Sequence, residues 1–403
     1  MKVVICGAGI AGLALAQRLD AFGWEVLVLE KAPGPRPQGY MIDFFGPGYD
    51  AAEAMGVLPR LAELGYRFEE ASWLDESGRC RARLRFDQFA KIVQGRLFSI
   101  LRPDLEQALR EQLSDDVDLR FATSLDAVHH TAEGVRVMLS DGDTLDADLL
   151  VGADGIHSRV RALVFGEEHR YLRYLGFHTA AFVFEDPRIH AQLDGRLCLT
   201  DTIDRQMGLY GLRDGRVATF AVHRSADPTP PRDPASAIRR EYGSLGWIIP
   251  QALDRCPPSA EVYYDQVAQI ELPWWSRHRV VLLGDAAYAV SPLAGQGASL
   301  AIAGAYVLAE QLAAAGSVET ALERYERLWR PVVEEKQQVA RDGIRWFLPH
   351  TRAQLRARHI VMGLSRLPGI DRYIAGALAG KSTALIKELH AADGEPTHAA
   401  TTR

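Results

Sequence analysis

Cysteine and lysine are scarce in this sequence of 403 residues. The four cysteines (Cys6, Cys80, Cys198, Cys256) lie far apart and show no metal-ligand spacing, so we expect buried or free thiols in a reducing, cytoplasmic setting and no metal site. Acidic and basic residues nearly balance, with 52 Asp and Glu against 46 Lys and Arg and a net charge of -6. No block of like charge predicts a nucleic-acid partner.

Charge is also missing from one long stretch, between Ala286 and Ala309. About 20 such residues could cross a bilayer. However, Ser291, Pro292 and Gly295 interrupt the stretch, and the strand-like "RVVLLGD" leads directly into it. We therefore interpret it as a loop followed by a helix and predict no integral membrane segment. The β-branched run "VVIC" begins at residue 3, so we predict no secretory signal.

The order of the predicted elements indicates an α/β fold. Strand 3–6, a helix and a strand ending at Glu30 form a βαβ unit of a parallel sheet. Residues 171–269 alternate in short segments and predict antiparallel β structure with one helix near 234–254. The stretch 117–150 predicts an antiparallel addition. We predict a discontinuous Rossmann-like dinucleotide-binding domain (1–70, 99–170, 271–330), a substrate domain (71–98, 171–270), C-terminal helices (331–390) and a disordered tail (391–403).

The first glycine-rich loop has the pattern G-x-G-x-x-G directly after a strand and at a helix start. Gly7 permits the tight turn, Gly9 lets a pyrophosphate approach the backbone, and Gly12 lets helix and sheet pack closely. Free N–H groups at the helix start bind the anion. Glu30 ends the second strand, where its carboxylate can accept hydrogen bonds from a ribose diol. The pattern does not distinguish FAD from NAD, because both contain an ADP half.

Two later segments complete a set of three signatures. "DLLVGADGIHSRVR" (148–161) is a strand, a turn at Asp154 and a helix start. After strand 279–283, Gly284 and Asp285 form a turn in which Asp285 can accept a hydrogen bond from a polyol. The glycines of "PLAGQG" (292–297) permit close contact with a flat ring, and the dipole of the next helix stabilises negative charge on that ring.

In this order and spacing the three signatures resemble the class A flavoprotein monooxygenases. This para-hydroxybenzoate hydroxylase-like group includes aromatic-polyketide hydroxylases and tetracycline-inactivating monooxygenases, and the similarity covers about residues 1–330. The resemblance implies FAD as cofactor and NAD(P)H as co-substrate. It implies that Arg36 meets NAD(P)H and that Asp43 contacts the flavin. It assigns the rest of the cofactor site to Gly7, Gly9, Ile10, Ala11, Gly12, Glu30, Lys31, Arg102, Asp154, Gly284, Asp285, Pro292, Gly295, Gln296, Gly297 and Ala298.

Three residues depart from the family pattern. The family usually has His where Tyr288 stands, Asn at Ser299 and an acidic residue at Gly304. These changes leave FAD binding intact as an expectation, but they place the positioning and reactivity of the flavin outside the common pattern.

The resemblance also implies the reaction. NAD(P)H reduces FAD, O₂ forms a C4a-hydroperoxide, and its distal oxygen is transferred to an aromatic or polycyclic small molecule such as a natural product or antibiotic. No catalytic side chain is needed, because the cofactor carries the chemistry. We expect the substrate between the flavin and the sheet of residues 171–269. Candidate contacts are His178, Met207, Tyr210, His223 and Arg224.

Other functions on the same fold stay open. A flavoprotein dehydrogenase or reductase fits the same signatures. A halogenase is weakly suggested by "GWIIP" (246–250), although no lysine lies between Lys91 and Lys336 to serve as its catalytic group. A catalytically silent binding protein is compatible with Tyr288 and Gly304.

Overall fold

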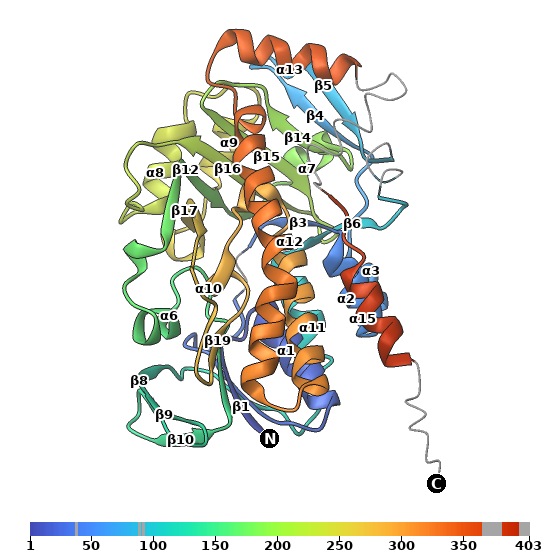
Figure 1. The fold of residues 1–403 in the computed structure, drawn as a ribbon. Helices are drawn as coiled ribbons and strands as arrows, with labels where there is room; N and C mark the ends of the chain where they lie inside the picture. Colours follow the sequence, from blue (N-terminus) through green and yellow to red (C-terminus); the bar gives the residue numbers. More distant parts are fainter. Residues whose placement is uncertain (37–38, 88–89, 91–92, 365–380, 395–403) are drawn as a thin grey trace.

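The computed structural model describes residues 1–36, 39–87, 90, 93–364 and 381–394. Two sheets lie one above the other, and a long helix runs along both (Figure 1). The predicted mixed α/β class, with a parallel sheet, a mainly antiparallel sheet and C-terminal helices, is confirmed.

The lower sheet is mostly parallel and has the strand order β18–β19–β11–β1–β2–β7. Most residues of its central strands are buried, as expected for a sheet that is covered on both faces. Only β18 runs antiparallel to its neighbour. The strands are β1 (Lys2–Cys6), β2 (Glu25–Leu29), β7 (Asp118–Arg120), β11 (Leu149–Gly152), β18 (Ser276–Arg277) and β19 (Val280–Leu282).

The antiparallel addition predicted for 117–150 is smaller than expected. β8 (Leu125–His130), β9 (Val135–Leu139) and β10 (Thr144–Ala147) form a three-stranded antiparallel sheet. β7, however, pairs in parallel with β2 and joins the main sheet. A three-residue strand carries too little alternation to reveal its partner from the sequence.

The helices of the lower layer surround α11 (Gly297–Ala314), which packs against α1 (Ile10–Ala21), α2 (Pro47–Ala54) and α12 (Val318–Phe347). By length and hydropathy α11 could span a membrane, but 83% of that window is buried inside the protein. It is therefore the core helix that the interrupted charge-free stretch predicts. α3 (Leu58–Leu64) and α5 (Arg102–Arg110) complete this layer.

The upper sheet has eight strands in the order β17–β12–β16–β15–β14–β4–β5, with β13 paired to β16. Its strands are β4 (Glu70–Leu74), β5 (Cys80–Arg85), β12 (Leu172–Ala181), β13 (Val183–Glu185), β14 (Leu197–Thr200), β15 (Arg205–Gly211), β16 (Arg216–Arg224) and β17 (Tyr263–Ile270). Below it, β3 (Met41–Phe45) pairs with β6 (Leu97–Leu101).

The outer face of this sheet is covered by short helices. They are α7 (Pro187–Leu193), α8 (Pro234–Tyr242) and α9 (Ile249–Asp254), and their apolar side chains form one cluster with the sheet. The single helix predicted near 234–254 is thus two helices. α8 ends before Gly243, and α9 restarts with Pro250 in its first turn.

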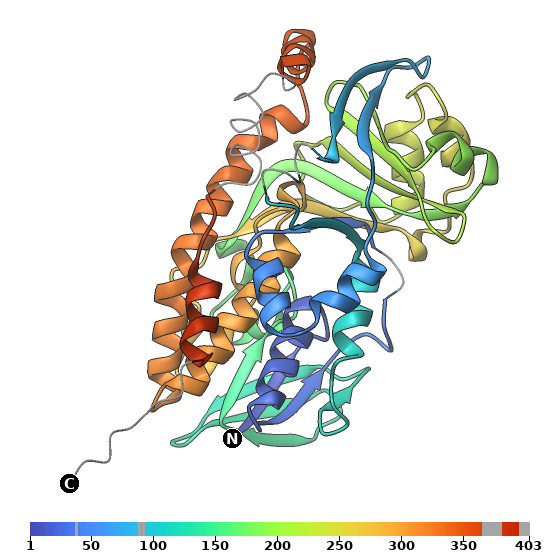
Figure 2. The ribbon, with the colours of Figure 1, turned by 90° about the vertical axis from the view of Figure 1, so that its right-hand side faces the viewer.

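The C-terminal part begins with α12, which spans both layers (Figure 2). The domain boundary predicted at residue 330 falls inside this continuous helix. α13 (Arg352–Leu364) then lies against the upper sheet, and α15 (Leu385–Gly394) returns to pack on α2 and α11. Residues 391–394 of the predicted disordered tail therefore continue a helix. The rest of that tail, 395–403, lies outside the described residues.

Candidate active site

The first glycine loop joins β1 to α1, and its three glycines meet different surroundings. Gly7 has φ +108°, and a Cβ added there would overlap the backbone of Ala153. A Cβ on Gly12 would overlap the carbonyl oxygen of Gly7. A Cβ on Gly9, by contrast, would lie at ordinary contact distance, 3.6 Å from Glu106 Oε1. Gly7 and Gly12 are therefore required by the fold, whereas Gly9 has room beside it.

Glu30 follows β2 and is tied back to this loop. Its Oε2 accepts a hydrogen bond from the N–H of Ala8 at 3.0 Å, and its Oε1 accepts one from the N–H of Ala32 at 2.8 Å. Arg36 contacts the same Oε1 at 3.4 Å and is otherwise exposed. The neighbouring Lys31 is exposed. The carboxylate is thus held rigidly at the end of the strand, where the sequence predicts it.

An arginine–glutamate pair adjoins Gly9. Arg102 begins α5, donates its backbone N–H to the carbonyl of Tyr40 at 3.1 Å and pairs with Glu106 at 2.7 Å. Burial raises the pKa of Glu106, although the Arg102 guanidinium acts in the opposite direction. A buried carboxylate is held as an anion most readily when such a partner faces it. The pair sets the charge beside the glycine loop.

Asp154 has a structural task in this protein. Its carboxylate accepts hydrogen bonds from Ser158 Oγ at 2.5 Å and from the N–H of Arg159 at 2.6 Å. These contacts order the start of α6 (Arg159–Val164), which is a capping arrangement. Two residues further on, buried Arg161 donates to the carbonyl of Ala286 at 2.9 Å. The second signature is therefore fastened to the third, and the proposed cofactor contact of Asp154 remains a prediction.

Asp285 opens the third signature, at the start of the short helix α10 (Asp285–Tyr288). Its side chain is accessible to solvent, yet burial among surrounding protein groups raises its pKa. A side chain that is both accessible and enclosed lines a recess. A Cβ on Gly297 would lie 3.9 Å from Asp285 Oδ1, and one on Gly284 would lie 2.8 Å from Ala11 Cβ. The first loop and the third signature thus meet directly, although 270 residues separate them along the chain.

The loop from Ser291 to Gly297, which we call the flavin loop, has an unusual backbone. Ser291 has φ 104° and ψ 135°, Pro292 starts a short 3₁₀ turn, and Gly295 has φ 64°. Gln296 is buried, and Gly297 starts α11, with Ala298 buried in its first turn. This backbone leads directly into the N-terminus of α11, whose dipole stabilises negative charge.

The departures from the family pattern make contacts of their own. Ser299 Oγ donates to the carbonyl of Phe45 at 2.6 Å and accepts from the N–H of Gly48 at 2.8 Å, which ties α11 to α2. Tyr288 and Gly304 face each other within the same core. Ser299 and Gly304 lie in α11, which follows the flavin loop, and Tyr288 lies in α10, which precedes it, so these contacts help to position the loop.

The upper sheet turns one face toward these cofactor segments. We call it the inner face. The ring of Tyr40 lies tilted against Phe220 of β16 at 5.4 Å and against Tyr263 of β17 at 5.3 Å between ring centroids. Tyr210 of β15 accepts a hydrogen bond from the N–H of Met41 at 2.8 Å. The inner face is therefore rich in aromatic side chains.

Asp43 lies on β3, close to this aromatic group. It accepts a hydrogen bond from Ser99 Oγ of β6 at 2.6 Å, and burial raises its pKa. Tyr210 is one of the groups that feel the Asp43 charge. The carboxylate is thus placed between the two-stranded sheet and the inner face, and its proposed flavin contact remains a prediction.

Three of the five predicted substrate contacts lie on the opposite, outer face. His223 Nδ1 pairs with Tyr242 OH of α8 at 2.9 Å, and His178 Nδ1 pairs with Tyr264 OH at 3.2 Å. Met207 is buried in the apolar cluster under α8 and α9. Burial lowers the pKa of His223 to about 4, so it is neutral at pH 7. We do not retain His178, Met207 and His223 as substrate contacts.

The other two predicted contacts belong to the inner side. Tyr210 faces β3 as described, and Arg224 pairs with Asp204 at 2.8 Å while its guanidinium lies over the ring of Phe177. Sequence reasoning missed Tyr40, Phe220 and Tyr263. Phe220 and Tyr263 share the inner face with every second residue of β16 and β17, but both faces of β16 are buried, so the sequence carries no signal that marks this face.

Comparison with known proteins agrees with this architecture. The FAD binding domain family matches residues 1–340 of the chain. The chain therefore belongs to this family, and the predicted resemblance to the class A flavoprotein monooxygenases is confirmed. It is an FAD-dependent monooxygenase.

Individual relatives cover most of its length. An uncharacterized protein of Mycobacterium tuberculosis is 33% identical, over 85% of this chain and 93% of the relative. A flavin-dependent monooxygenase from an unknown prokaryotic organism is 30% identical, over 83% of this chain and 87% of the relative. The crystal structure of the tetracycline destructase Tet(55) superimposes with a TM-score of 0.78 at 27% identity, over 94% of this chain and 97% of that one.

Proposed function

We propose that the protein hydroxylates an aromatic or polycyclic small molecule with O₂ and NAD(P)H. The observation that carries this proposal is the aromatic inner face of the upper sheet, which stands opposite the flavin loop. Phe220 and Tyr263 lie there with Tyr40, and Leu293 of the flavin loop packs against an apolar cluster that includes Val267 of β17. Flat apolar substrates bind to such surfaces by burial and stacking. The likeness to a tetracycline destructase supports a polycyclic natural product or antibiotic as the substrate class.

We infer that the three signatures together bind one extended FAD molecule. We infer that Gly9, Glu30 and Arg102 hold its ADP half, because they surround the open side of the first glycine loop. The Asp285 carboxylate lies beside Gly297, and we infer that it accepts a hydrogen bond from the ribityl chain. The flavin loop then receives the ring. Ile10, Ala11, Gly12, Gly284, Pro292, Gly295, Gln296 and Ala298 supply the surrounding backbone.

Bound FAD supplies the redox chemistry, accepting electrons from NAD(P)H and activating O₂. The protein's part is to bind, orient and exclude water. Water exclusion is served by the aromatic inner face and by the buried start of α11. The dipole of α11 stabilises negative charge at its N-terminus, next to the flavin loop. Arg36 is proposed to meet NAD(P)H. The described residues offer no group of His, Cys, Asp and Glu that could hold a metal ion.

The test is oxygen incorporation. The purified protein is supplied with NADPH, ¹⁸O₂ and a panel of aromatic natural products, and the products are analysed by mass spectrometry. We expect at least one ligand to stimulate NADPH oxidation and to gain one ¹⁸O atom. Oxidation or reduction of the ligand without label would instead favour a dehydrogenase or reductase. No flavin reduction with any ligand would favour a binding protein.

The inner face is tested by a pair of variants. Phe220→Leu removes an inner-face ring, whereas Phe184→Leu removes a ring buried in the outer-face cluster. We expect the first to raise KM for the stimulating ligand about fivefold and the second to leave it unchanged, since a lost aromatic contact costs about 1 kcal/mol. Equal effects would remove the inner face from the proposal.

A further inference from the structure

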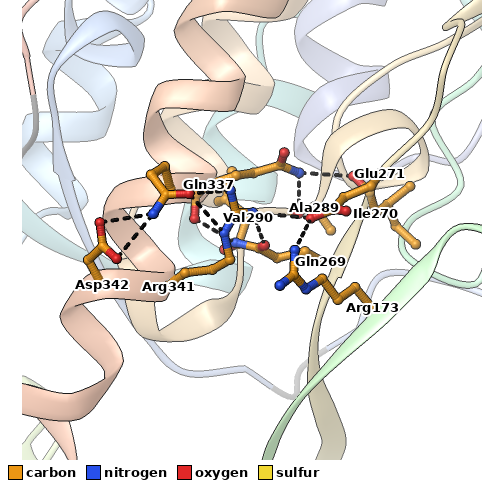
Figure 3. Close-up of polar contacts among 10 residues, drawn as sticks. Arg173, Gln269, Ile270, Glu271, Ala289, Val290, Gln337, Arg341 and Asp342 are labelled. Atoms are coloured by element: carbon orange, nitrogen blue, oxygen red, sulfur yellow. Dashed lines mark hydrogen bonds and ion pairs between the residues drawn. The ribbon is translucent and has the colours of Figure 1, made fainter.

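Two buried glutamine side chains join three separate elements next to the flavin loop. Gln269 of β17 donates from Nε2 to the carbonyls of Val290 and Gln337, both at 3.0 Å. Gln337 of α12 donates from Nε2 to the carbonyls of Ile270 at 2.9 Å and Ala289 at 3.1 Å (Figure 3). Their exposed fractions are 0% and 5%. Each glutamine therefore bonds the backbone next to the other and also the backbone before the flavin loop.

The orientation of Gln269 is fixed from outside. Arg341 Nη1 donates to Gln269 Oε1 at 2.7 Å and to Glu271 Oε1 at 3.1 Å, and Arg173 holds Glu271 at 3.0 Å. An arginine can only donate, so the amide oxygen must face it and the amide nitrogen must face the carbonyls. The donor arrangement follows from this network and leaves no alternative flip.

The segment that these amides hold runs into a strained residue. Ala289 and Val290 directly precede Ser291, whose φ of 104° is rare for a residue other than glycine. A strained conformation persists only where its surroundings fix it, and such residues gather at functional sites. The side chain of Ser291 accepts a hydrogen bond from the N–H of Leu293 at 3.2 Å, which starts the 3₁₀ turn. The glutamines fix the backbone on one side of Ser291, and this turn fixes it on the other.

Strand β17 touches the same loop a second time. Val267, two residues before Gln269 and on the same face of the strand, packs in an apolar cluster with Leu293. Two contacts therefore define the position of the flavin loop relative to the upper sheet. One is the hydrogen bond from Gln269 to Val290, and the other is the apolar cluster that contains Val267 and Leu293. Gln337 of α12 stabilises the polar contact, because its backbone carbonyl accepts from Gln269 and its side chain donates to the carbonyl of Ala289.

We propose that Gln269 and Gln337 are positioning residues that hold Ser291 in its strained conformation and thereby set the distance of the flavin loop from the inner face. This inference rests on the proposed function, in which that loop receives the flavin ring. Two apolar side chains of equal size would fill the same volume, but they would leave the carbonyls of Ala289 and Val290 without these donors. The pair therefore serves the backbone geometry and not the packing alone.

The experiment uses Gln269→Met and Gln337→Met, which keep the side-chain size and remove the donors. The matched control is Gln251→Met on the exposed side of α9, which covers the outer face of the upper sheet and takes no part in this network. Hydrogen exchange of residues 289–299 is followed by mass spectrometry in the FAD-free protein. We expect exchange about ten- to hundredfold faster in the two test variants than in wild type and control, because each variant removes a buried hydrogen bond that holds this segment against local opening. Residues 135–139 serve as an unaffected internal reference.

A second readout follows the cofactor. In the test variants we expect FAD to bind about tenfold more weakly, with a shifted flavin absorbance band, while the control matches wild type. Unchanged exchange over 289–299 in both test variants would overturn the proposal. If both test variants fail to fold, hydrogen exchange of the FAD-free wild-type protein tests the proposal. Slow exchange of residues 291–293 would support the positioning role of Gln269 and Gln337, and fast exchange would refute it. If exchange is faster in the test variants but neither wild type nor variants bind FAD, the proposed function is wrong, whereas the positioning role of the two glutamines is supported.

Discussion

The hydroxyl of Tyr288 lies in the space that a side chain at residue 304 would fill. A Cβ added to Gly304 would overlap that hydroxyl and would approach Trp329 Nε1 to 2.7 Å. Tyr325 OH donates to the same hydroxyl at 3.3 Å. Two departures from the family pattern therefore compensate each other. The larger tyrosine at residue 288 occupies the volume that the glycine at residue 304 leaves free.

This relationship predicts a stability effect. Gly304→Ala should lower the free energy of unfolding by about 1–3 kcal/mol, because overpacking forces the tyrosine or the helix to move. Adding Tyr288→Phe should recover part of that loss. Thermal unfolding of the single and double variants measures the coupling. Gly316→Ala is the control, since a Cβ there meets nothing within 4 Å. A loss at Gly304 no larger than at Gly316 would contradict this compensation.

The first glycine loop predicts that its positions fail in different ways. Gly9→Val should leave the FAD-free protein folded, with a stability change within about 0.5 kcal/mol, yet abolish FAD retention. Gly12→Val should prevent folding, because its side chain would overlap the carbonyl oxygen of Gly7. Circular dichroism and flavin absorbance of the purified proteins separate the two effects. Normal FAD content in Gly9→Val would show that the ADP half of FAD does not bind at this loop.

The sequence predicted the family and the FAD cofactor, because each of the three signatures combines a glycine pattern with a defined place between strand and helix. It did not predict which face of the upper sheet looks inward. Both faces of β16 are buried, so "RVATFAVHR" has no polar side to mark its orientation. A shift by one residue exchanges the faces. For this reason the sequence favours His223 as a substrate contact and does not single out Phe220, which lies three residues earlier on the other face.

Asp285 predicts a conflict between stability and binding. Burial raises its pKa, so the ionised form costs free energy in the FAD-free protein at pH 7. Asp285→Asn should therefore raise the melting temperature of the FAD-free protein while weakening FAD binding about tenfold or more. Differential scanning calorimetry and flavin titration give the two quantities. A lower melting temperature in the variant would show that the carboxylate supports the fold instead.

Arg36 predicts a separation between reduction and binding. Its contact with Glu30 is long and exposed, so Arg36→Ala should change stability by less than about 0.5 kcal/mol. If Arg36 meets NAD(P)H, the variant should bind FAD normally and be reduced about tenfold more slowly in anaerobic stopped flow. The opposite outcome, weaker FAD binding with an unchanged rate of reduction, would mean that Arg36 acts only through Glu30.

His157 links the second signature to the upper sheet, and its contacts predict that the stability of the protein depends on pH. Its Nδ1 lies 3.0 Å from Glu168 and its Nε2 lies 3.4 Å from Asp265 of β17. The bond to Asp265, with that to Glu168, raises the pKa of His157 from 6.5 to about 9. Because the folded-state pKa is the higher one, the stabilisation is complete below pH 6.5 and disappears as pH rises through 9. The side chain is 45% exposed, so solvent screening limits the effect to about 1 kcal/mol or less. His157→Gln should thus melt below wild type at pH 6, and the two melting curves should converge above pH 9. A difference that stays constant across this range would show that the histidine contributes by hydrogen bonding alone, without its charge.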